Sequence, residues 1–379
     1  MNIGRPLRIV IFGLSITSSW GNGHATTYRS LVKGLERRGH RVTFFERRRS
    51  WYMENRDLRR SNLCEIVLYD SVSELASLLP SGIDADLVIV GSYVPEGSRV
   101  ASWVLSHTNA ITAFYDIDTP VTVSALERNE CEYLTRALVP EFDLYLSFSG
   151  GPILETLKER FGAREARPLY CSVDAEEYFP LPLVPQFDLA YLGTYSADRQ
   201  PKLDELLLKP AREWGMGRFC AAGSQYPETI RWPKNVTRLD HVAPSNHCRF
   251  YNSQRFTLNV TRQDMIASGY SPSVRLFEAA ACGVPIVSDD WPGLERFFTP
   301  GTEILVAQDS DDVLQILQDM DHADARSIGA LAHTRVLREH TSEHRAKELE
   351  TYVSAFFHSP PRLNPPNVTV TRTTGPVLL

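Results

Sequence analysis

The sequence predicts an α/β protein with two doubly wound parallel sheets, one in each of two domains. Short apolar stretches alternate with amphipathic stretches along most of the chain, which is typical of strands joined by crossover helices. A proline-bearing segment interrupts this alternation at residues 176–186. The length of 379 residues also exceeds one core of the commonest size. We therefore expect domains at residues 1–175 and 187–340, a linker at 176–186 and a cleft between the domains.

The first domain begins with a predicted buried strand at residues 7–12, followed by the loop LSITSSWGNGH. The next helix has Tyr28, Leu31, Val32 and Leu35 at the i, i+3, i+4, i+7 spacing of one buried face. Such a strand, loop, helix and strand unit implies a parallel sheet with a right-handed crossover. The remaining predicted strands are 41–45, 63–69, 86–90, 110–115, 144–148 and 167–171, and the remaining predicted helices are 72–79, 97–107, 124–137 and 152–161.

The first loop has the wrong glycine spacing for dinucleotide binding. Gly13, Gly21 and Gly23 do not form G-x-G-x-x-G, and only Glu46 follows the second strand as an acidic residue. The sequence thus disfavours NAD. The loop places His24 at a helix start, at the carboxyl end of the first strand, where ligands of open α/β sheets bind. A histidine there is either a polar helix-start residue or a general base.

A second polar strand end is YDIDTP at residues 115–120, where Asp116 and Asp118 stand at i and i+2. In one interpretation Asp118 or Thr119 caps the next helix, with Pro120 in its first turn. In another, an aspartate is a base or an anchor for a substrate hydroxyl. In a third, the pair is an Asp-x-Asp metal site that holds a diphosphate through a divalent cation.

The second domain repeats the pattern from residue 187 onward. Its first loop, GTYSADR at residues 193–199, follows the first predicted strand as the loop of the first domain does. A closing helix is expected at 341–358, and the proline- and threonine-rich tail at 359–379 is expected to be mobile or packed as an extended strap. The predicted strands are 187–192, 217–222, 236–239, 256–260, 284–288 and 304–306, and the predicted helices are 201–214, 245–251, 274–282, 311–320, 323–337 and 342–357.

The segment SGYSPSVRLFEAAACGVPIVSDDWPGLE, residues 268–295, predicts a loop, a helix, a strand and a loop. Its turn is small and rich in hydroxyl groups, and the helix after it begins with free backbone N–H groups. Such a helix start is a ready site for a phosphate. An ordinary αβ unit with a capped helix has the same pattern, so both interpretations stand at this point.

Composition excludes several classes of function. A formal net charge of −6 disfavours nucleic acid as the partner, and the short basic runs at 47–49 and 56–60 are interpreted as solvated surface. The six cysteines are scattered without zinc-site spacing, as in reduced intracellular proteins. No apolar run reaches the length of a membrane span. We expect a cytoplasmic protein without an integral membrane segment.

Several pieces together resemble the GT-B glycosyltransferases, a fold of two Rossmann-like domains around a cleft. The pieces YLGTYSADR (191–199), LNVTR (258–262), GYSPSVRLFEAAACGVPIVSD (269–289) and GLERFFTPGTEILVA (293–307) are similar to the CgeB-like branch, the spore-maturation-protein type. The resemblance is specific across residues 187–307. In the first domain it depends on the strand pattern and on GNGHATTYR and YDIDTP.

The resemblance implies that the second domain binds a nucleotide-sugar donor and the first domain an acceptor. By position, Glu278 matches the glutamate that holds the donor ribose. Positions that bind the diphosphate are matched by Ser271, Ser273 and Arg275, and the facing loop completes the site with Gly193, Thr194 and Arg199. A helix start and a guanidinium stabilise a leaving diphosphate without metal. No cofactor is implied beyond the nucleotide sugar itself.

One position departs from the pattern. Many retaining relatives have a glutamate eight residues before the position of Glu278, near the sugar, and here that residue is Tyr270. The base candidates are then His24, Asp116 and Asp118. We expect a metal-independent hexosyltransferase-type enzyme that uses a UDP- or dTDP-linked sugar and a hydroxyl acceptor. The alternatives are a metal-dependent transferase that uses Asp116 and Asp118, or an inactive scaffold that binds sugar nucleotides.

Overall fold

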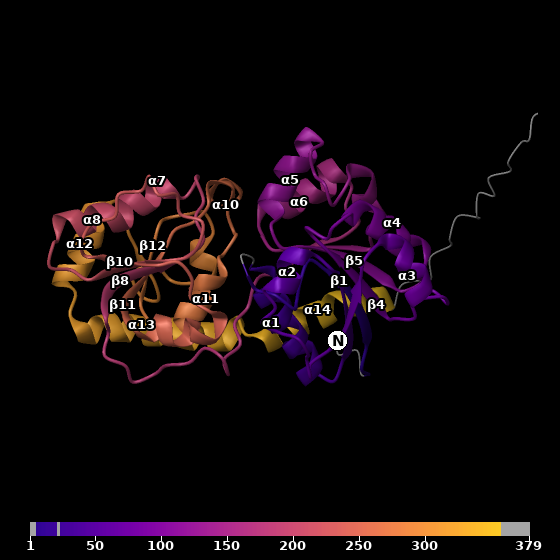
Figure 1. The fold of residues 1–379 in the computed structure, drawn as a ribbon, viewed down its shortest axis with the longest axis horizontal. Helices are drawn as coiled ribbons and strands as arrows, with labels where there is room; N and C mark the ends of the chain where they lie inside the picture. Colours follow the sequence, from indigo (N-terminus) through magenta and orange to yellow (C-terminus); the bar gives the residue numbers. More distant parts are fainter. Residues whose placement is uncertain (1–4, 21–22, 358–379) are drawn as a thin grey trace, which may run out of the picture.

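The computed structural model describes residues 5–20 and 23–357. The predicted tail at 359–379 and Gly21 of the first loop lie outside the described residues. Two α/β domains stand side by side, and each is built on a parallel sheet (Figure 1). This arrangement confirms the predicted fold class.

The first domain contains a seven-stranded sheet in the order β3-β2-β1-β4-β5-β6-β7, with every pair parallel. The order reverses between β1 and β4, so the loop after β1 lies at the topological switch point, where open α/β sheets bind ligands. The strands are β1 (Arg8–Gly13), β2 (Arg41–Arg47), β3 (Glu65–Tyr69), β4 (Leu87–Gly91), β5 (Ile111–Asp116), β6 (Leu144–Ser147) and β7 (Ala166–Pro168).

Helices cover both faces of this sheet. Along β1, Ile9 and Ile11 pack into one apolar core while Val10 and Phe12 pack into the other, because successive strand residues point to opposite faces. A strand that is apolar on both faces requires a helical layer on each side. The helices of the first domain are α1 (His24–Arg37), α2 (Ser50–Glu54), α3 (Val72–Leu78), α4 (Gly97–Ser106), α5 (Thr119–Arg128) and α6 (Pro152–Phe161).

The second domain contains a six-stranded parallel sheet in the order β10-β9-β8-β11-β12-β13, with its reversal between β8 and β11. The strands are β8 (Phe187–Leu192), β9 (Phe219–Ala222), β10 (Val236–Leu239), β11 (Gln254–Asn259), β12 (Ile286–Ser288) and β13 (Leu305–Val306). The helices are α7 (Gln200–Leu203), α8 (Lys209–Glu213), α9 (His247–Asn252), α10 (Gln263–Ser268), α11 (Val274–Ala281), α12 (Ser310–Asp319) and α13 (His322–Glu339).

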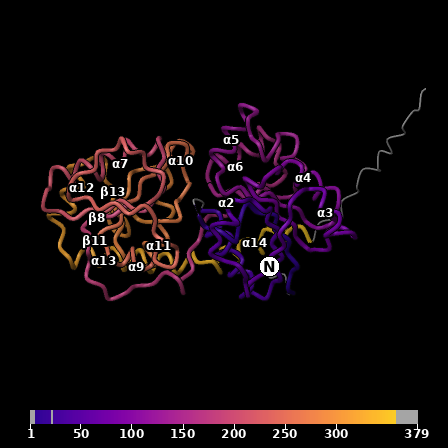
Figure 2. The backbone as a smooth tube through the Cα atoms, in the orientation of Figure 1, coloured from indigo at the N-terminus to yellow at the C-terminus, as the bar shows by residue number. Residues whose placement is uncertain are grey.

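The last helix, α14 (Ser342–Phe357), leaves the second domain and packs against α1 of the first (Figure 2). Glu350 of α14 accepts hydrogen bonds from Arg38 at 2.6 and 2.7 Å, and its Oε1 lies 2.6 Å from Nε2 of His40. At the crossing, Val173 donates to His340 O and Ser342 donates to Val173 O. The chain therefore crosses between the domains twice, and the two crossings are hydrogen-bonded to each other.

One predicted helix, at 124–137, has wrong bounds. The observed α5 begins at Thr119, directly after β5, and ends at Arg128. Pro120 fits the first turn of a helix, and Asn129 ends it in the left-handed region at φ 57°. A 3-10 turn, Arg136–Glu141, follows separately. The short helices α2 and α10 are not among the predicted elements.

Candidate active site

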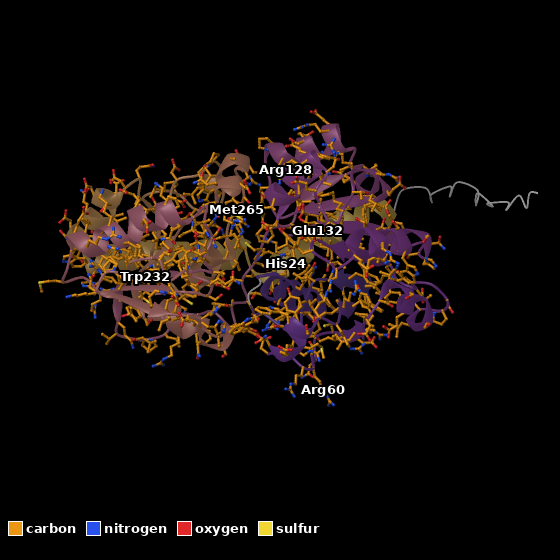
Figure 3. The ribbon with its side chains drawn as sticks, turned by 45° about the horizontal axis from the view of Figure 1, so that its top comes forward. His24, Arg60, Arg128, Glu132, Trp232 and Met265 are labelled. Atoms are coloured by element: carbon orange, nitrogen blue, oxygen red, sulfur yellow. The ribbon has the colours of Figure 1, made fainter. Side chains whose placement is uncertain are left out.

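A cavity of about 610 Å³ lies where the carboxyl ends of the two sheets face each other. The first domain lines it with the loop after β1 and the start of α1, and with the ends of β4 and β5. From the second domain come the loops after β8 and β9 and the start of α11. Figure 3 labels His24 and Met265, which line this cavity from the first and the second domain. The volume is typical of small-molecule sites.

The start of α11 forms one wall of the cavity. Ser273 is the N-cap residue, yet its hydroxyl donates to Asn259 Oδ1 at 2.8 Å instead of capping the helix. The first-turn N–H groups are therefore without a side-chain cap, and Ser273, Val274 and Arg275 line the cavity. Free N–H groups at a helix start, together with the helix dipole, favour an anion at this wall.

Arg275 is held firmly within this wall. Its Nε donates to Leu192 O at 2.6 Å and its Nη1 donates to Asn259 Oδ1 at 2.8 Å, while the guanidinium carbon lies 4.6 Å from the centre of the Tyr191 ring. The side chain is buried and borders the cavity. These contacts orient a positive group beside the helix start before any ligand binds.

Glu278 lies one turn further along α11 and also lines the cavity. Tyr251 of α9 donates its hydroxyl hydrogen to Glu278 Oε2 at 2.8 Å. The side chain of Tyr178, in the linker, faces the same carboxylate. Burial is the largest cause of the raised pKa of the Tyr178 hydroxyl, and the charge of Glu278 raises it further. The Glu278 carboxylate is therefore held in place one turn of α11 away from Arg275.

The loop after β8 covers the guanidinium of Arg275. A Cβ atom on Gly193 would lie 2.8 Å from Arg275 Nη2 and 2.4 Å from the Tyr191 hydroxyl, so only glycine permits this approach. Arg199 lines the cavity, donates from Nη2 to Thr194 O at 2.7 Å, and has a buried Nε without a hydrogen-bond partner. The structure therefore brings Gly193, Thr194 and Arg199 next to α11.

His24 stands on the opposite wall as the first residue of α1. Its ring makes an edge contact with Tyr93 at 5.2 Å between centroids, and its buried Nδ1 has no hydrogen-bond partner among residues 5–20 and 23–357. Although part of the side chain borders the cavity, desolvation lowers the pKa of His24 to about 4. The imidazole is then neutral at physiological pH, as a general base requires.

Asp118 lines the same wall and joins the two domains. Its Oδ2 accepts from the Tyr93 hydroxyl at 3.1 Å and from Arg262 Nη1 of the second domain at 3.5 Å. Burial raises its pKa, while the charge of Arg262 opposes that shift. Asp118 also occupies the N-cap position of α5, but its side chain makes no capping hydrogen bond. Its carboxylate is directed to Tyr93 and Arg262 instead.

Asp116 is fully buried and is not part of the cavity lining. Its carboxylate accepts from the Tyr145 hydroxyl at 2.6 Å, from the Thr122 hydroxyl at 2.7 Å and from the backbone N of Asp118 at 3.2 Å. These contacts fix the turn between β5 and α5. The geometry therefore argues against direct proton transfer by Asp116 and favours a structural role.

We expect the Asp116→Asn variant to change the pH dependence of stability. Burial raises the pKa of Asp116 to about 6, from 3.8 in an unfolded chain, so the native state keeps a proton that the unfolded state releases between these values. The contribution of Asp116 to the free energy of unfolding of the wild type is fully present below pH 4 and is lost as pH rises through 6. The free energy of unfolding of the variant, minus that of wild type, should rise by about 3 kcal/mol from pH 4 to pH 7. Denaturant unfolding at each pH measures it, and a constant difference would contradict the prediction.

Tyr270 and Ser271 lie at the contact between the domains and not in the cavity lining. Tyr270 O accepts from Gly150 N at 3.0 Å, and the two hydroxyls of Ser271 and Ser149 are 2.7 Å apart. A Cβ atom on Gly151 would lie 2.3 Å from the Tyr270 ring. The turn before α11 packs against the loop after β6, so both residues contact the first domain. The sequence had predicted Tyr270 beside the sugar and Ser271 beside the diphosphate.

Some cavity residues escaped the sequence-based prediction. Tyr93 follows the end of β4 and has a left-handed backbone at φ 61°, and Arg262 follows β11. Trp20 of the first domain lies 4.7 Å, between ring centroids, from His241 of the second. Polar residues at strand ends were the available signal for Tyr93, and the piece LNVTR was the signal for Arg262. The contacts that these residues make across the domain boundary are not encoded in any local sequence pattern.

Two further observations concern metals and membranes. Among residues 5–20 and 23–357, no group of at least three His, Cys, Asp or Glu side chains has an arrangement that would hold a metal ion. No helix in the same part of the chain is long and apolar enough to cross a bilayer.

Two parallel-sheet α/β domains, with a cavity between the carboxyl ends of their strands, define the GT-B glycosyltransferase fold, and this chain has that fold. Residues 199–351 match the sequence profile of the glycosyl transferase-like family. No curated protein sequence matches the chain.

Solved structures resemble the chain over almost its full length. Sucrose-phosphate synthase from Thermosynechococcus elongatus has a TM-score of 0.67 at 16% identity, with 93% of this chain and 99% of that one covered. HepE of Anabaena, solved in complex with UDP-glucose, has a TM-score of 0.65 at 11% identity and covers 92% and 100%. An alpha-glucosyltransferase, solved with UDP and a 13-mer DNA, has a TM-score of 0.66 at 15% identity and covers 92% and 100%.

Proposed function

We propose that this protein is a glycosyltransferase that moves a sugar from a UDP- or dTDP-linked donor to a hydroxyl acceptor. The observation that carries the proposal is the wall formed by the start of α11, Arg275 and Glu278, which faces His24 across the cavity. HepE, with the same fold, was solved with UDP-glucose. The quoted sequence pieces support a position in the CgeB-like branch and hexosyltransferase-type activity.

The donor contacts follow from the order of groups along α11. The diphosphate would accept hydrogen bonds from the first-turn N–H groups and pair with Arg275, since both present positive charge to the cavity. Glu278, one turn away, would accept hydrogen bonds from the ribose hydroxyls. When the bond to the sugar breaks, negative charge grows on the diphosphate. The same wall stabilises that charge without reorganising, because its groups are already fixed.

The acceptor hydroxyl must lose a proton, and His24 is the group that we propose to take it. Its Nδ1 is unpartnered, its ring is neutral at physiological pH, and it borders the cavity. Asp118 is already bound to Tyr93 and Arg262, so we assign it a positioning role in which it holds the two domains together. Closure of the cavity around the donor would exclude water from the reacting bond.

A metal-dependent transferase is the enzymatic alternative. It would need both Asp116 and Asp118 as ligands of a cation that bridges to the diphosphate. Only Asp118 borders the cavity, whereas Asp116 is occupied by Tyr145 and Thr122. We therefore propose transfer without a metal or another cofactor. Activity that disappears with EDTA and returns with Mg²⁺ would favour the alternative.

The alternative from another class is a scaffold that binds sugar nucleotides without turnover. It shares the α11 wall with the enzyme but does not require a neutral histidine, free of described hydrogen-bond partners at Nδ1, across the cavity from that wall.

We also propose that the protein is cytoplasmic and does not act on nucleic acid. Six free thiols and the net charge of −6 support these two proposals.

We expect Glu278→Gln to weaken UDP binding about ten- to hundredfold, because a charge-assisted hydrogen bond to the ribose becomes a neutral one. The amide oxygen of the variant still accepts from Tyr251, so the melting temperature should change little. Isothermal titration with UDP measures the dissociation constant.

Gln254→Ala is the matched control for this variant, because Gln254 is buried in the same domain but does not line the cavity. Its UDP affinity should equal that of wild type. An unchanged dissociation constant for Glu278→Gln would remove the ribose assignment.

A further inference from the structure

A second cavity, of about 350 Å³, lies at the junction of α13 and α14 and shares no lining residue with the first. It contains four arginines against two glutamates, a concentration of positive charge in a chain whose net charge is −6. Its lining residues are Tyr170, Arg296, Phe297, Arg335, Arg338, Glu339, His340, His344, Arg345 and Glu348.

His340 presents an unsatisfied, oriented donor in this cavity. The residue is 7% exposed, and its Nε2 is buried without a hydrogen-bond partner in the part of the chain that the structure describes. Arg345 Nη2 lies 2.5 Å from His340 Nδ1, and because a guanidinium only donates, Nδ1 must be the acceptor. Burial, with Arg345 beside the ring, lowers the pKa of His340 to about 2, so the ring is neutral. A neutral ring that accepts at Nδ1 carries its hydrogen on Nε2.

The cavity contains more arginines than its glutamates can neutralise. Glu339 is shared between Arg335 and Arg338, at 2.8 Å from each, and Glu348 pairs with Arg345 at 2.8 Å. Glu303, outside the cavity, lies 3.9 Å from Arg335, so four arginines face three glutamates. The exposed guanidinium of Arg296 makes no hydrogen bond or ion pair with any described residue. Excess guanidinium groups and a buried N–H donor together favour an anion with several acceptor oxygens.

Glu348 adds a requirement for a hydroxyl group. No described residue donates a hydrogen bond to its buried Oε2, whereas its Oε1 accepts from Arg345. A buried carboxylate oxygen needs a donor, which inorganic sulfate lacks and a hydroxylated ligand supplies. We propose that this cavity binds a phosphate monoester that carries hydroxyl groups, with the phosphate on the arginines and His340 Nε2 and a hydroxyl on Glu348.

The position of this second cavity links it to the donor wall and to the domain crossing. The His340 ring stacks on Phe277 of α11 at 4.6 Å between centroids, and α11 carries Arg275 and Glu278 into the first cavity. The backbone of His340 also accepts from Val173 at the crossing between the domains. A ligand on His340 therefore contacts the residue through which α11 and the crossing segment meet, and its binding should change donor affinity at the first cavity.

The test is isothermal titration of the full chain with glucose 6-phosphate at fixed ionic strength, with the first cavity saturated by UDP. Wild type should bind one equivalent, with inorganic sulfate, which has no hydroxyl group, at least about tenfold weaker and glucose not bound. Arg296→Gln/Arg338→Gln should weaken glucose 6-phosphate at least about tenfold, since both side chains are exposed and their loss removes two of the four guanidinium groups.

The matched control is Arg59→Gln/Arg60→Gln, which removes the same charge from exposed positions outside both cavities and should bind as wild type does. His340→Phe, which keeps the stack on Phe277, should also weaken binding. No binding by wild type at millimolar glucose 6-phosphate, or equal weakening in the control, would overturn the site. Equal affinity for inorganic sulfate would overturn the hydroxyl contact. The dissociation constant for UDP, measured with and without glucose 6-phosphate, tests the coupling, and an unchanged value would overturn the coupling but not the site.

Discussion

Replacing Arg275 with alanine should lower kcat/KM for the donor about 10²- to 10³-fold, the cost of removing one preorganised group that stabilises transition-state charge. The fixed position of the guanidinium, between Leu192 O and Asn259 Oδ1 and over the Tyr191 ring, is the reason for the large effect. The loss should appear in kcat as well as in donor affinity, because the negative charge is greater when the diphosphate leaves. Release of UDP under initial-rate conditions measures both parameters.

Arg275 also has structural contacts, so the control must remove comparable contacts elsewhere. Arg255→Ala does so, because Arg255 donates to Leu317 O and Met320 O and lies over the Phe256 ring at 5.1 Å, yet does not line the cavity. It should lose stability without losing kcat per folded molecule. Equal activity losses in the two variants would show that Arg275 acts on the fold and not on the donor.

Replacing His24 with alanine should lower kcat about 10²- to 10⁴-fold, the range for loss of a general base, with little change in the dissociation constant for UDP. Wild-type activity should fall only as pH approaches 4, because protonation at that pKa removes the base. The acid limb should be absent from the residual activity of the variant. Initial rates from pH 3.5 to 8, with UDP titrations beside them, separate the two effects.

His107→Ala is the control for His24→Ala, since His107 also lies at a helix terminus and contacts an aromatic ring, that of Trp103 at 4.5 Å, but lies outside the cavity. Its kcat should equal that of wild type. If His24→Ala keeps full kcat while Asp118→Asn loses it, Asp118 is the base and the roles assigned to the two residues are reversed.

The fold was predictable because its signals are local. Apolar strands between amphipathic helices indicated both sheets, and β8, β10, α6 and α14 begin and end where the sequence predicts. The predicted bounds of α5 were wrong because Asn129 ends the helix with a left-handed backbone, which no pattern of apolar residues reveals.

Most of the residues predicted for the candidate site line the cavity, because they lie on α11 or in loops that follow strands. Ser273, Arg275 and Glu278 lie on one helix, so their spacing along the chain determines their spacing in the cavity. Tyr270 and Ser271 precede the same helix, but contact with Gly150 and Ser149 directs them to the domain boundary. Ser271 and Ser149, which form part of that contact, are more than a hundred residues apart in the sequence. The pairing of Asp118 with Arg262 is hidden from the sequence for the same reason.

The most direct test of donor chemistry in the first cavity is nucleotide release by the purified protein from a panel of UDP- and dTDP-sugars, with and without EDTA. We predict slow release of nucleoside diphosphate from one donor even without acceptor, unchanged by EDTA and abolished by Arg275→Ala. Donor binding at full occupancy without any release, with or without added Mg²⁺, would contradict the proposal and indicate a sugar-nucleotide-binding scaffold.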